Sequence, residues 1–288
     1  MHPLEHHFIK TNGLTLHTVM TGPADGPVII LLHGFPEFWY GWRSQFPALA
    51  AAGYRVWMPD QRGYNLSDKP RGAAAYTLDK LAADITGLID ATGQERVYLA
   101  GHDWGAMVAW ALALLAPERL RHLAILNVPH PVVSRRHLLS DPRQMARSLY
   151  AFYFQLPWLP EMGMRAFNWR LLARTLRATS LPDTFTDEAL AHYRRAWSQP
   201  GAMTAMLNWY RAVPRAAAQG WPPPQIHVPT TIIWGRQDFA LRSVMAEESA
   251  ALCDLGELIW LPDNTHWVQH EAADRVNAIL LERFTTRA

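Results

Sequence analysis

A tight strand-to-helix turn around Asp103 constrains the fold more than any other feature of the sequence. Residues 96–100 are largely apolar and typical of a buried strand, whereas residues 106–112 are typical of a helix. Gly101 and Gly105 flank the turn, and glycine lets the backbone reverse sharply and lets strand and helix approach closely. We therefore expect the Asp103 side chain to project from the tip of the turn, where it can act on a ligand.

An aspartate at this position determines which chemistry the turn can support. A carboxyl group with an unperturbed pKa of about 3.9 is already ionised at neutral pH, whereas a serine would need a base. The anion can displace a leaving group from saturated carbon and form an ester whose carbonyl belongs to the protein. Water can then hydrolyse that ester, so Asp103 suits the hydrolysis of epoxides or alkyl halides. The structural alternative is a helix cap, which aspartate also favours.

The composition is that of one large globular domain or of a domain with an insertion. The chain has 288 residues, 49% of them hydrophobic, and its net charge of +2 implies no strong field for nucleic acid or anionic lipid. Cys253 is the one cysteine, which excludes an intramolecular disulfide, and we expect it to pack within a helix. Residues 1–10 do not resemble a signal peptide, and no apolar run reaches the about 20 residues of a membrane span. We expect a cytoplasmic protein.

Strand-like and helix-like segments alternate along most of the chain, which predicts an α/β fold with a mostly parallel sheet flanked by helices. The expected strands lie at residues 27–32, 54–58, 96–100, 123–126, 231–234 and 258–261. The expected helices lie at residues 41–52, 77–92, 106–112, 244–252 and 271–284. Thr77 is the expected cap at the start of its helix, and Gly93 the expected stop at its end.

A helical insertion interrupts this alternation. Between about residues 131 and 224 the sequence contains no β-rich run, and its helical segments are rich in arginine, methionine and aromatic residues. We therefore expect a core domain from residues 1–130 and 225–288. Residues 131–224 are expected to form a helical cap domain over the ends of the strands. Three consecutive prolines at residues 222–224 would form its stiff exit.

The ends of the last two expected strands supply the groups that a nucleophilic Asp103 would need. Asp238 follows one strand and His266 follows the next, in the chain order nucleophile, acid, histidine. Either residue alone would be unremarkable, but their joint occurrence in this order indicates function. His102 is the neighbouring alternative base, although its side chain should point away from Asp103 and support the structure.

Two backbone N–H groups could stabilise the negative oxygen that forms when water attacks the ester. One belongs to Trp104, directly after the aspartate, and the other to Phe35 in the loop at residues 33–36. The alternative for this loop is a plain turn, because glycine and proline favour turns.

Together these residues resemble the α/β-hydrolase superfamily and, within it, the α/β-hydrolase-fold epoxide hydrolases. The resemblance covers nearly the whole chain, and its matching pieces are residues 33–37, 60–64, 101–105, 150–155 and 208–211, with Asp238 and His266. In this family two cap tyrosines donate hydrogen bonds to the epoxide oxygen, and the matching positions are Tyr150 and Tyr210. Tyr153, one helical turn from Tyr150, could share that role. Asn65 departs from the family, which usually has glycine there, and asparagine tolerates left-handed backbone angles.

The resemblance implies an epoxide hydrolase with an inserted cap and with no metal or organic cofactor. It implies attack by Asp103 on an epoxide carbon, followed by hydrolysis of the ester by water that His266, oriented by Asp238, activates. The expected product is a vicinal diol, and the expected partners are a small, apolar epoxide and water. A homodimer is left open. The residues expected to contact substrate are Phe35, Trp104, Tyr150, Tyr210 and Trp267.

Dehalogenation is the alternative reaction. Haloalkane dehalogenases resemble the chain at Asp103 and Trp104, but they often carry asparagine where this chain has Phe35. Haloacetate dehalogenases carry arginines just after the nucleophile, where this chain has Trp104 and Met107. A third interpretation is a binding module without catalysis. The presence of Asp103, Asp238 and His266 together disfavours it, because a binding protein does not need all three.

Overall fold

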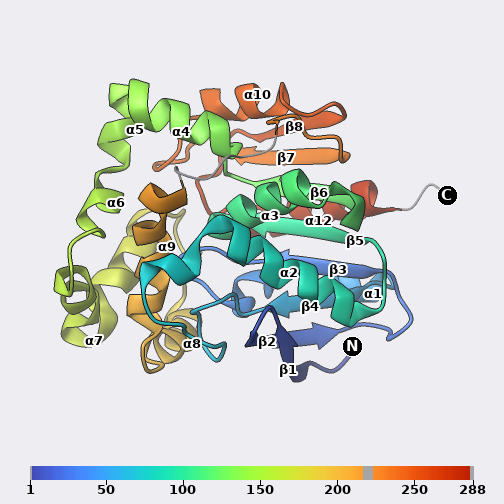
Figure 1. Ribbon diagram of the computed structural model, residues 1–288, viewed down its shortest axis with the longest axis horizontal. Coiled ribbons are helices and arrows are strands. Elements are labelled where there is room, and N and C mark those ends of the chain that lie inside the picture. The colour runs from blue at the N-terminus through green and yellow to red at the C-terminus, as the bar shows by residue number, and fades with distance from the viewer. Residues whose placement is uncertain (1, 217–222, 286–288) are drawn as a thin grey trace.

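The computed structural model describes residues 2–216 and 223–285, and Figure 1 shows how their helices and strands are arranged. The strands of this part of the chain are β1 (Glu5–Thr11), β2 (Leu14–Thr21), β3 (Val28–Leu32), β4 (Arg55–Pro59), β5 (Val97–His102), β6 (Leu120–Leu126), β7 (Thr230–Gly235) and β8 (Gly256–Leu261). They form one sheet in the order β1-β2-β4-β3-β5-β6-β7-β8. β2 pairs antiparallel with both β1 and β4, and the remaining pairings are parallel. The expected mostly parallel sheet is confirmed.

Helices cover both faces of the sheet (Figure 1). The elements flanking the sheet are η1 (Trp39–Trp42), α1 (Phe46–Ala51), η2 (Ala73–Tyr76), α2 (Leu78–Thr92), α3 (Trp104–Leu115), η3 (Pro117–Arg119), α10 (Val244–Ala250), α11 (Val268–Glu271) and α12 (Ala273–Phe284). Side chains of α2, α3 and α10 belong to one hydrophobic core, and those of α1, α11 and α12 to a second core. The α/β architecture predicted from the sequence is therefore present.

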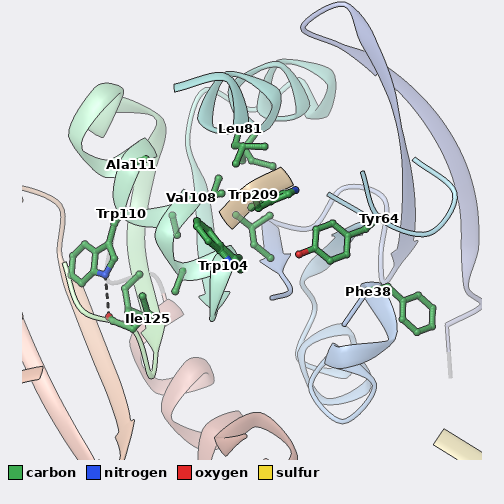
Figure 2. Packing of buried hydrophobic residues seen from close by; sticks show 14 of the residues in the cluster. Phe38, Tyr64, Leu81, Trp104, Val108, Trp110, Ala111, Ile125 and Trp209 are labelled. Carbon is green, nitrogen blue, oxygen red and sulfur yellow. Dashed lines mark hydrogen bonds between the residues drawn. The ribbon is translucent and has the colours of Figure 1, made fainter. Parts of the chain in front are cut away.

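The sequence of β3 explains why both faces need helices. Ile29 packs in the core beneath α1 and α12, and the next residue, Ile30, packs in the core beneath α2 and α3. Successive strand side chains point to opposite faces, so a strand covered on both sides must be continuously apolar. Figure 2 shows part of the core at α3, where the indole of Trp110 donates a hydrogen bond of 3.2 Å to the carbonyl of Val128.

The hairpin of β1 and β2 has no counterpart among the expected elements. β1 lies at the edge of the sheet and exposes most of its side chains, so its sequence lacks a continuous apolar run. The turn itself is an Asn12–Gly13 pair with φ of 45° and 76°, placed between paired residues Thr11 and Leu14. Asparagine followed by glycine is a strong signal for a two-residue hairpin turn. That signal could have located the hairpin from the sequence.

One expected helix is broken in the structure, and another begins slightly later than expected. Residues 41–52 divide into η1 and α1, and Pro47 lies in the first turn of α1, where its missing N–H is tolerated. The helix expected at residues 271–284 is α12, which begins at Ala273 because Ala272, with φ of −125° and ψ of 41°, lies outside the helical region.

Helix α2 matches its expected bounds, but only one of its caps acts as expected. Gly93 ends the helix at a left-handed φ of 73°, whereas Thr77 holds the N-cap position without accepting a hydrogen bond through its side chain. Cys253 does not lie in a helix. It follows α10, forms an isolated bridge with Ile226 and is buried. Its packing role is consistent with this position.

Between β6 and β7 the described residues form six helices: α4 (Pro131–Ser140), α5 (Pro142–Arg147), α6 (Leu149–Tyr153), α7 (Leu159–Ala178), α8 (Asp187–Trp197) and α9 (Ala202–Ala216). Figure 1 places them at the edge toward which the parallel strands point. Of the three prolines expected after them, Pro222 lies outside the described residues. Among the helices that the structure describes, none is long and apolar enough to cross a bilayer.

Candidate active site

The turn between β5 and α3 holds Asp103 in a backbone conformation that residues with side chains rarely adopt. Its φ is 50° and its ψ is −125°. A Cβ atom on Gly105 would lie 2.1 Å from the carbonyl oxygen of Leu32, and one on Gly101 would lie 2.5 Å from the carbonyl oxygen of Gly105. The two glycines are therefore required for strand and helix to meet, and this contact forces Asp103 to the tip of the turn.

The Asp103 carboxylate lies between a backbone N–H and an imidazole. Its Oδ1 accepts a hydrogen bond of 2.6 Å from the N–H of Phe35, and its Oδ2 lies 3.6 Å from Nε2 of His266. The loop can approach this closely because Gly34 has no side chain: a Cβ atom there would lie 2.2 Å from Cβ of Asp103. Trp104 begins α3 directly after the aspartate. Both expected N–H donors thus belong to residues beside the carboxylate.

His266 is held on its other side by Asp238. Nδ1 of His266 lies 2.7 Å from Oδ2 of Asp238, and both side chains are buried. Oδ1 of Asp238 accepts hydrogen bonds of 2.8 Å and 2.9 Å from the N–H groups of Ala240 and Leu241. These donors fix the carboxylate plane, and the carboxylate in turn orients the imidazole.

Asn127 also orients Asp238, and the sequence analysis missed it. Its amide donates a hydrogen bond of 2.8 Å to Oδ2 of Asp238, and its oxygen accepts one of 2.9 Å from the N–H of Gly235. Asn127 follows β6 directly and has a left-handed φ of 51°. The signal in the sequence was a polar residue at a parallel strand end, where the side chains of neighbouring strands converge.

The groups around them shift the pKa values of Asp103 and His266 in opposite directions. Burial opposes ionisation of Asp103, but the hydrogen bond and charge of His266 and the N–H of Phe35 outweigh it, and the pKa of Asp103 is lowered. Burial also opposes protonation of His266. Attraction to Asp238 and Asp103 outweighs this burial and raises the pKa of His266 to about 10. The resting site therefore contains an imidazolium between two carboxylates at neutral pH.

His102 is turned away from the Asp103 carboxylate, as expected. Its Nε2 lies 2.9 Å from the carbonyl oxygen of His266, and its Nδ1 lies 3.0 Å from the side-chain amide of Gln269. The same amide donates a hydrogen bond of 3.0 Å to the buried carboxylate of Glu37. No local pattern in the sequence assigns Glu37 a role, because its partners come from parts of the chain far apart in sequence.

Two tyrosines of the helical insertion lie opposite Asp103. Tyr150 of α6 and Tyr210 of α9 meet edge to face, with ring centroids 6.0 Å apart. Burial raises the pKa of both phenols, and so does the Asp103 carboxylate. Both hydroxyls therefore keep their protons at neutral pH and can donate them in hydrogen bonds. Tyr153 differs, because its hydroxyl contacts the carbonyl oxygen of Leu159 at 3.4 Å.

Aromatic contacts fix the position of α9 over the turn. Trp209 meets the rings of Trp104 and Tyr64 edge-on at 5.6 Å and 5.4 Å, and Figure 2 shows these three rings together. Its indole donates a hydrogen bond of 3.0 Å to the carbonyl of Arg62. Tyr210, the next residue, packs on Trp104 at 5.0 Å. The second tyrosine is thus anchored by the same rings that line the turn.

Two cavities of about 320 Å³ each meet at Asp103. Tyr150, Tyr210 and Leu241 line both of them. Trp104 and Met107, both of α3, line the first cavity together with apolar residues of the insertion. The second cavity is lined by the remaining expected site residues, Phe35, His266 and Trp267. Asp238 lies behind His266, so the structure brings every expected site residue to one place.

Asn65 lies outside this set. It has the positive φ of 38° expected for a position where glycine is usual, and its amide donates a hydrogen bond of 2.8 Å to Asp60. The substitution therefore keeps the loop conformation and adds a polar contact to a buried carboxylate.

The comparisons with known proteins agree with this arrangement. Residues 27–273 match the family described as alpha/beta hydrolase fold. The AB hydrolase superfamily protein YfhM of Bacillus subtilis (strain 168) is 46% identical over 275 residues, which are 96% of each chain. Epoxide hydrolase 4 of Mus musculus is 36% identical over 278 residues, covering 94% of this chain and 77% of that protein.

Solved structures give the same result. A crystal structure of Bacillus megaterium epoxide hydrolase in complex with an inhibitor superposes with a TM-score of 0.87 and 28% identity. The superposition covers 97% of this chain and 100% of that chain. Because the family match spans most of the chain and the relatives align over at least 94% of it, the chain belongs to the α/β-hydrolase family and is similar in sequence and fold to its epoxide hydrolases.

Proposed function

We propose that the protein is an epoxide hydrolase that forms an ester on Asp103 and releases a vicinal diol. One observation carries the proposal: Tyr150 and Tyr210, from two helices of the insertion, line both cavities that meet at Asp103. An epoxide oxygen needs a proton donor when its ring opens, whereas a departing halide does not. In this proposal residues 131–224 form a cap domain over a core of residues 1–130 and 225–288.

The first half-reaction opens the epoxide. Asp103 attacks one ring carbon, and a tyrosine hydroxyl donates a proton to the oxygen, which becomes the first alcohol. The lowered pKa of Asp103 keeps the nucleophile ionised. Ester formation removes the negative charge that lies 3.6 Å from His266, so the imidazolium loses one of its two carboxylate partners. Its pKa then falls, and the proton it releases returns to the tyrosine.

The second half-reaction hydrolyses the ester. Neutral His266, oriented by Asp238, takes a proton from water, and the resulting hydroxide attacks the ester carbonyl. The N–H groups of Phe35 and Trp104 stabilise the negative oxygen of the intermediate. Collapse breaks the ester bond and expels an alkoxide, which takes the proton of the newly formed Asp103 carboxylic acid, so that the diol leaves, the carboxylate is restored and His266 remains an imidazolium. Each group ends the cycle in the state in which it began.

A paired assay tests the reaction class. Purified protein is offered styrene oxide and 1-bromobutane in parallel, and diol and bromide are measured. The proposal predicts diol from the first substrate and no bromide from the second. Bromide without diol would establish dehalogenation, the alternative that Trp104 allows. No turnover of either substrate, or of a panel of aliphatic and aromatic epoxides, would contradict the proposal and favour a binding module.

A further inference from the structure

Charge is distributed unequally along the sequence, which the small net charge conceals. Residues 131–224 contain twelve arginines, no lysine and five acidic residues, whereas the rest of the chain contains fifteen basic and twenty acidic residues. The helical insertion is therefore strongly basic and the remainder acidic. The net charge of +2 for the whole chain is the sum of these two opposite contributions. It therefore does not describe the electrostatic field at the surface of either part.

The positive charge is concentrated and exposed on α4, α5 and α7, which lie with α6 along one edge of the molecule (Figure 1). We call this surface the α5–α7 face. Its two acidic residues, Asp141 and Glu161, are already paired with Arg242 and Arg211. Within the described residues, Arg136 and Arg177 are the arginines of this face that form ion pairs. The exposed arginines are Arg135, Arg136, Arg143, Arg147, Arg165, Arg170, Arg174 and Arg177.

The same face exposes large apolar side chains. Exposure reaches 53% for Phe152, 65% for Trp158, 61% for Met162 and 81% for Phe167. Leu139, Met145, Leu149, Leu156, Leu159 and Leu171 are exposed as well. Helices α6 and α7 touch through Tyr153, whose hydroxyl contacts the first residue of α7, so these side chains belong to neighbouring elements. Large apolar side chains exposed in such number on neighbouring elements are typical of a binding surface.

A strained kink in α7 presents the most exposed of these side chains. Phe167, Asn168 and Trp169 have φ of 52°, 55° and 64° inside the helix. Left-handed angles are unfavourable for residues with bulky side chains. Trp169 is buried and its indole donates a hydrogen bond of 2.8 Å to Ser198, whereas Phe167 points to the exterior. The kink thus buries Trp169 and leaves Phe167, 81% exposed, among the exposed apolar side chains of this face.

We propose that the α5–α7 face lies on the surface of anionic phospholipid membranes. Segments that rest in the headgroup region without spanning the bilayer typically combine exposed arginines with exposed leucine and aromatic side chains.

A second copy of the chain would fit this face less well. A two-fold dimer through this face would place the same arginines against each other, with both acidic residues already paired. Lipid phosphate supplies the missing negative charge, and the acyl boundary accepts the apolar side chains.

The position of the candidate active site agrees with this orientation. Tyr150, Tyr153 and Leu171 belong to the helices of the α5–α7 face, are partly exposed and also line a cavity at Asp103. This step rests on the proposed function. The substrates would then be lipophilic epoxides dissolved in the bilayer, which reach the cavity without crossing water. The docking surface itself does not depend on that function.

Vesicle flotation tests the surface directly. The protein is mixed with vesicles of phosphatidylcholine alone or of an equimolar mixture with phosphatidylglycerol, and the floated fraction is measured. We expect binding to the anionic vesicles and little to the neutral ones. The double variant Arg170→Gln/Arg174→Gln should bind about 25-fold more weakly, because each basic residue near an anionic surface strengthens binding about fivefold. Its matched control, Lys10→Gln/Arg275→Gln, removes two exposed charges from the core and should bind as the wild type does.

Phe167→Ser tests the apolar contribution, with Phe8→Ser on β1 as its control at a comparably exposed phenylalanine. Weaker binding of the first alone supports the proposal. Absent binding to anionic vesicles, equal binding to neutral ones, or equal losses in both charge variants would overturn it. A wild-type dimer that Phe167→Ser dissociates, without vesicle binding, would assign the face to a second copy. Binding without diol formation would support this face and contradict the proposed function.

Discussion

Replacing Asp103 by asparagine should lower the pKa of His266, because it removes a charge while nearly preserving shape. The two groups lie 3.6 Å apart. At an effective dielectric constant of about 20, unit charges at this separation attract by about 4.6 kcal/mol, which corresponds to about 3 pH units. The pKa of His266 should therefore fall from about 10 to about 7 in the variant. Formation of the ester would have the same effect, so the variant reproduces the charge state of the proposed intermediate.

The assay is a pH titration of the histidine ring carbons by NMR. The chain has 13 histidines, so His266→Gln serves to assign the resonance by its disappearance. A difference of less than about one pH unit between wild type and Asp103→Asn would refute the coupling. It would also contradict the proposal that ester formation on Asp103 lowers the pKa of His266 and so yields the neutral imidazole.

The raised pKa makes a related prediction about stability. The folded value for His266 lies above the unfolded value of 6.5, so the folded state keeps a proton that the unfolded state loses. The contribution to the free energy of unfolding is complete below pH 6.5 and is lost as the pH rises through about 10. Urea unfolding across this interval should show a decline in the wild type that is smaller in Asp103→Asn.

Three further substitutions test the site. His266→Gln should trap the ester, seen by mass spectrometry as added substrate mass on the peptide containing Asp103; an accepted epoxide that leaves no adduct would contradict covalent catalysis. Tyr150→Phe combined with Tyr210→Phe should lower the rate of diol formation at least about 100-fold, and full activity would exclude the tyrosines as proton donors. Gly105→Ala should lower the free energy of unfolding by about 3 kcal/mol or more, because a Cβ atom would lie 2.1 Å from a backbone oxygen. Wild-type stability in urea would contradict that steric argument.

The sequence predicted those parts of the molecule that depend on short segments. The two glycines around Asp103 and the order of Asp238 and His266 at strand ends required only local patterns and the rule that parallel strands end together. Apolar runs such as that of β3 predicted the buried strands, because burial on both faces leaves a continuous signal. The fold predicted in this way is confirmed, and the roles of the site residues stay predictions.

The parts that were missed depend on contacts between distant segments or on exposed structure. β1 is an edge strand with exposed side chains, so hydrophobic periodicity could not indicate it. Asn127 and Glu37 act through hydrogen bonds to residues more than 100 positions away, and no local pattern specifies such a partner. The exposed face of α5, α6 and α7 was hidden for a different reason, since net charge averages over parts of opposite sign.

In the proposed mechanism the carboxylate of Asp103 bonds to substrate carbon, and isotope labelling can detect that bond. Enzyme in excess over epoxide is allowed a single turnover in water enriched in ¹⁸O, and the peptide containing Asp103 and the diol are analysed by mass spectrometry. The account predicts that the heavy oxygen enters the Asp103 carboxyl group, because water attacks the ester carbonyl, while the first diol carries ordinary oxygen. Heavy oxygen in the diol with none in Asp103 would mean that water attacked the epoxide itself, and would contradict the account.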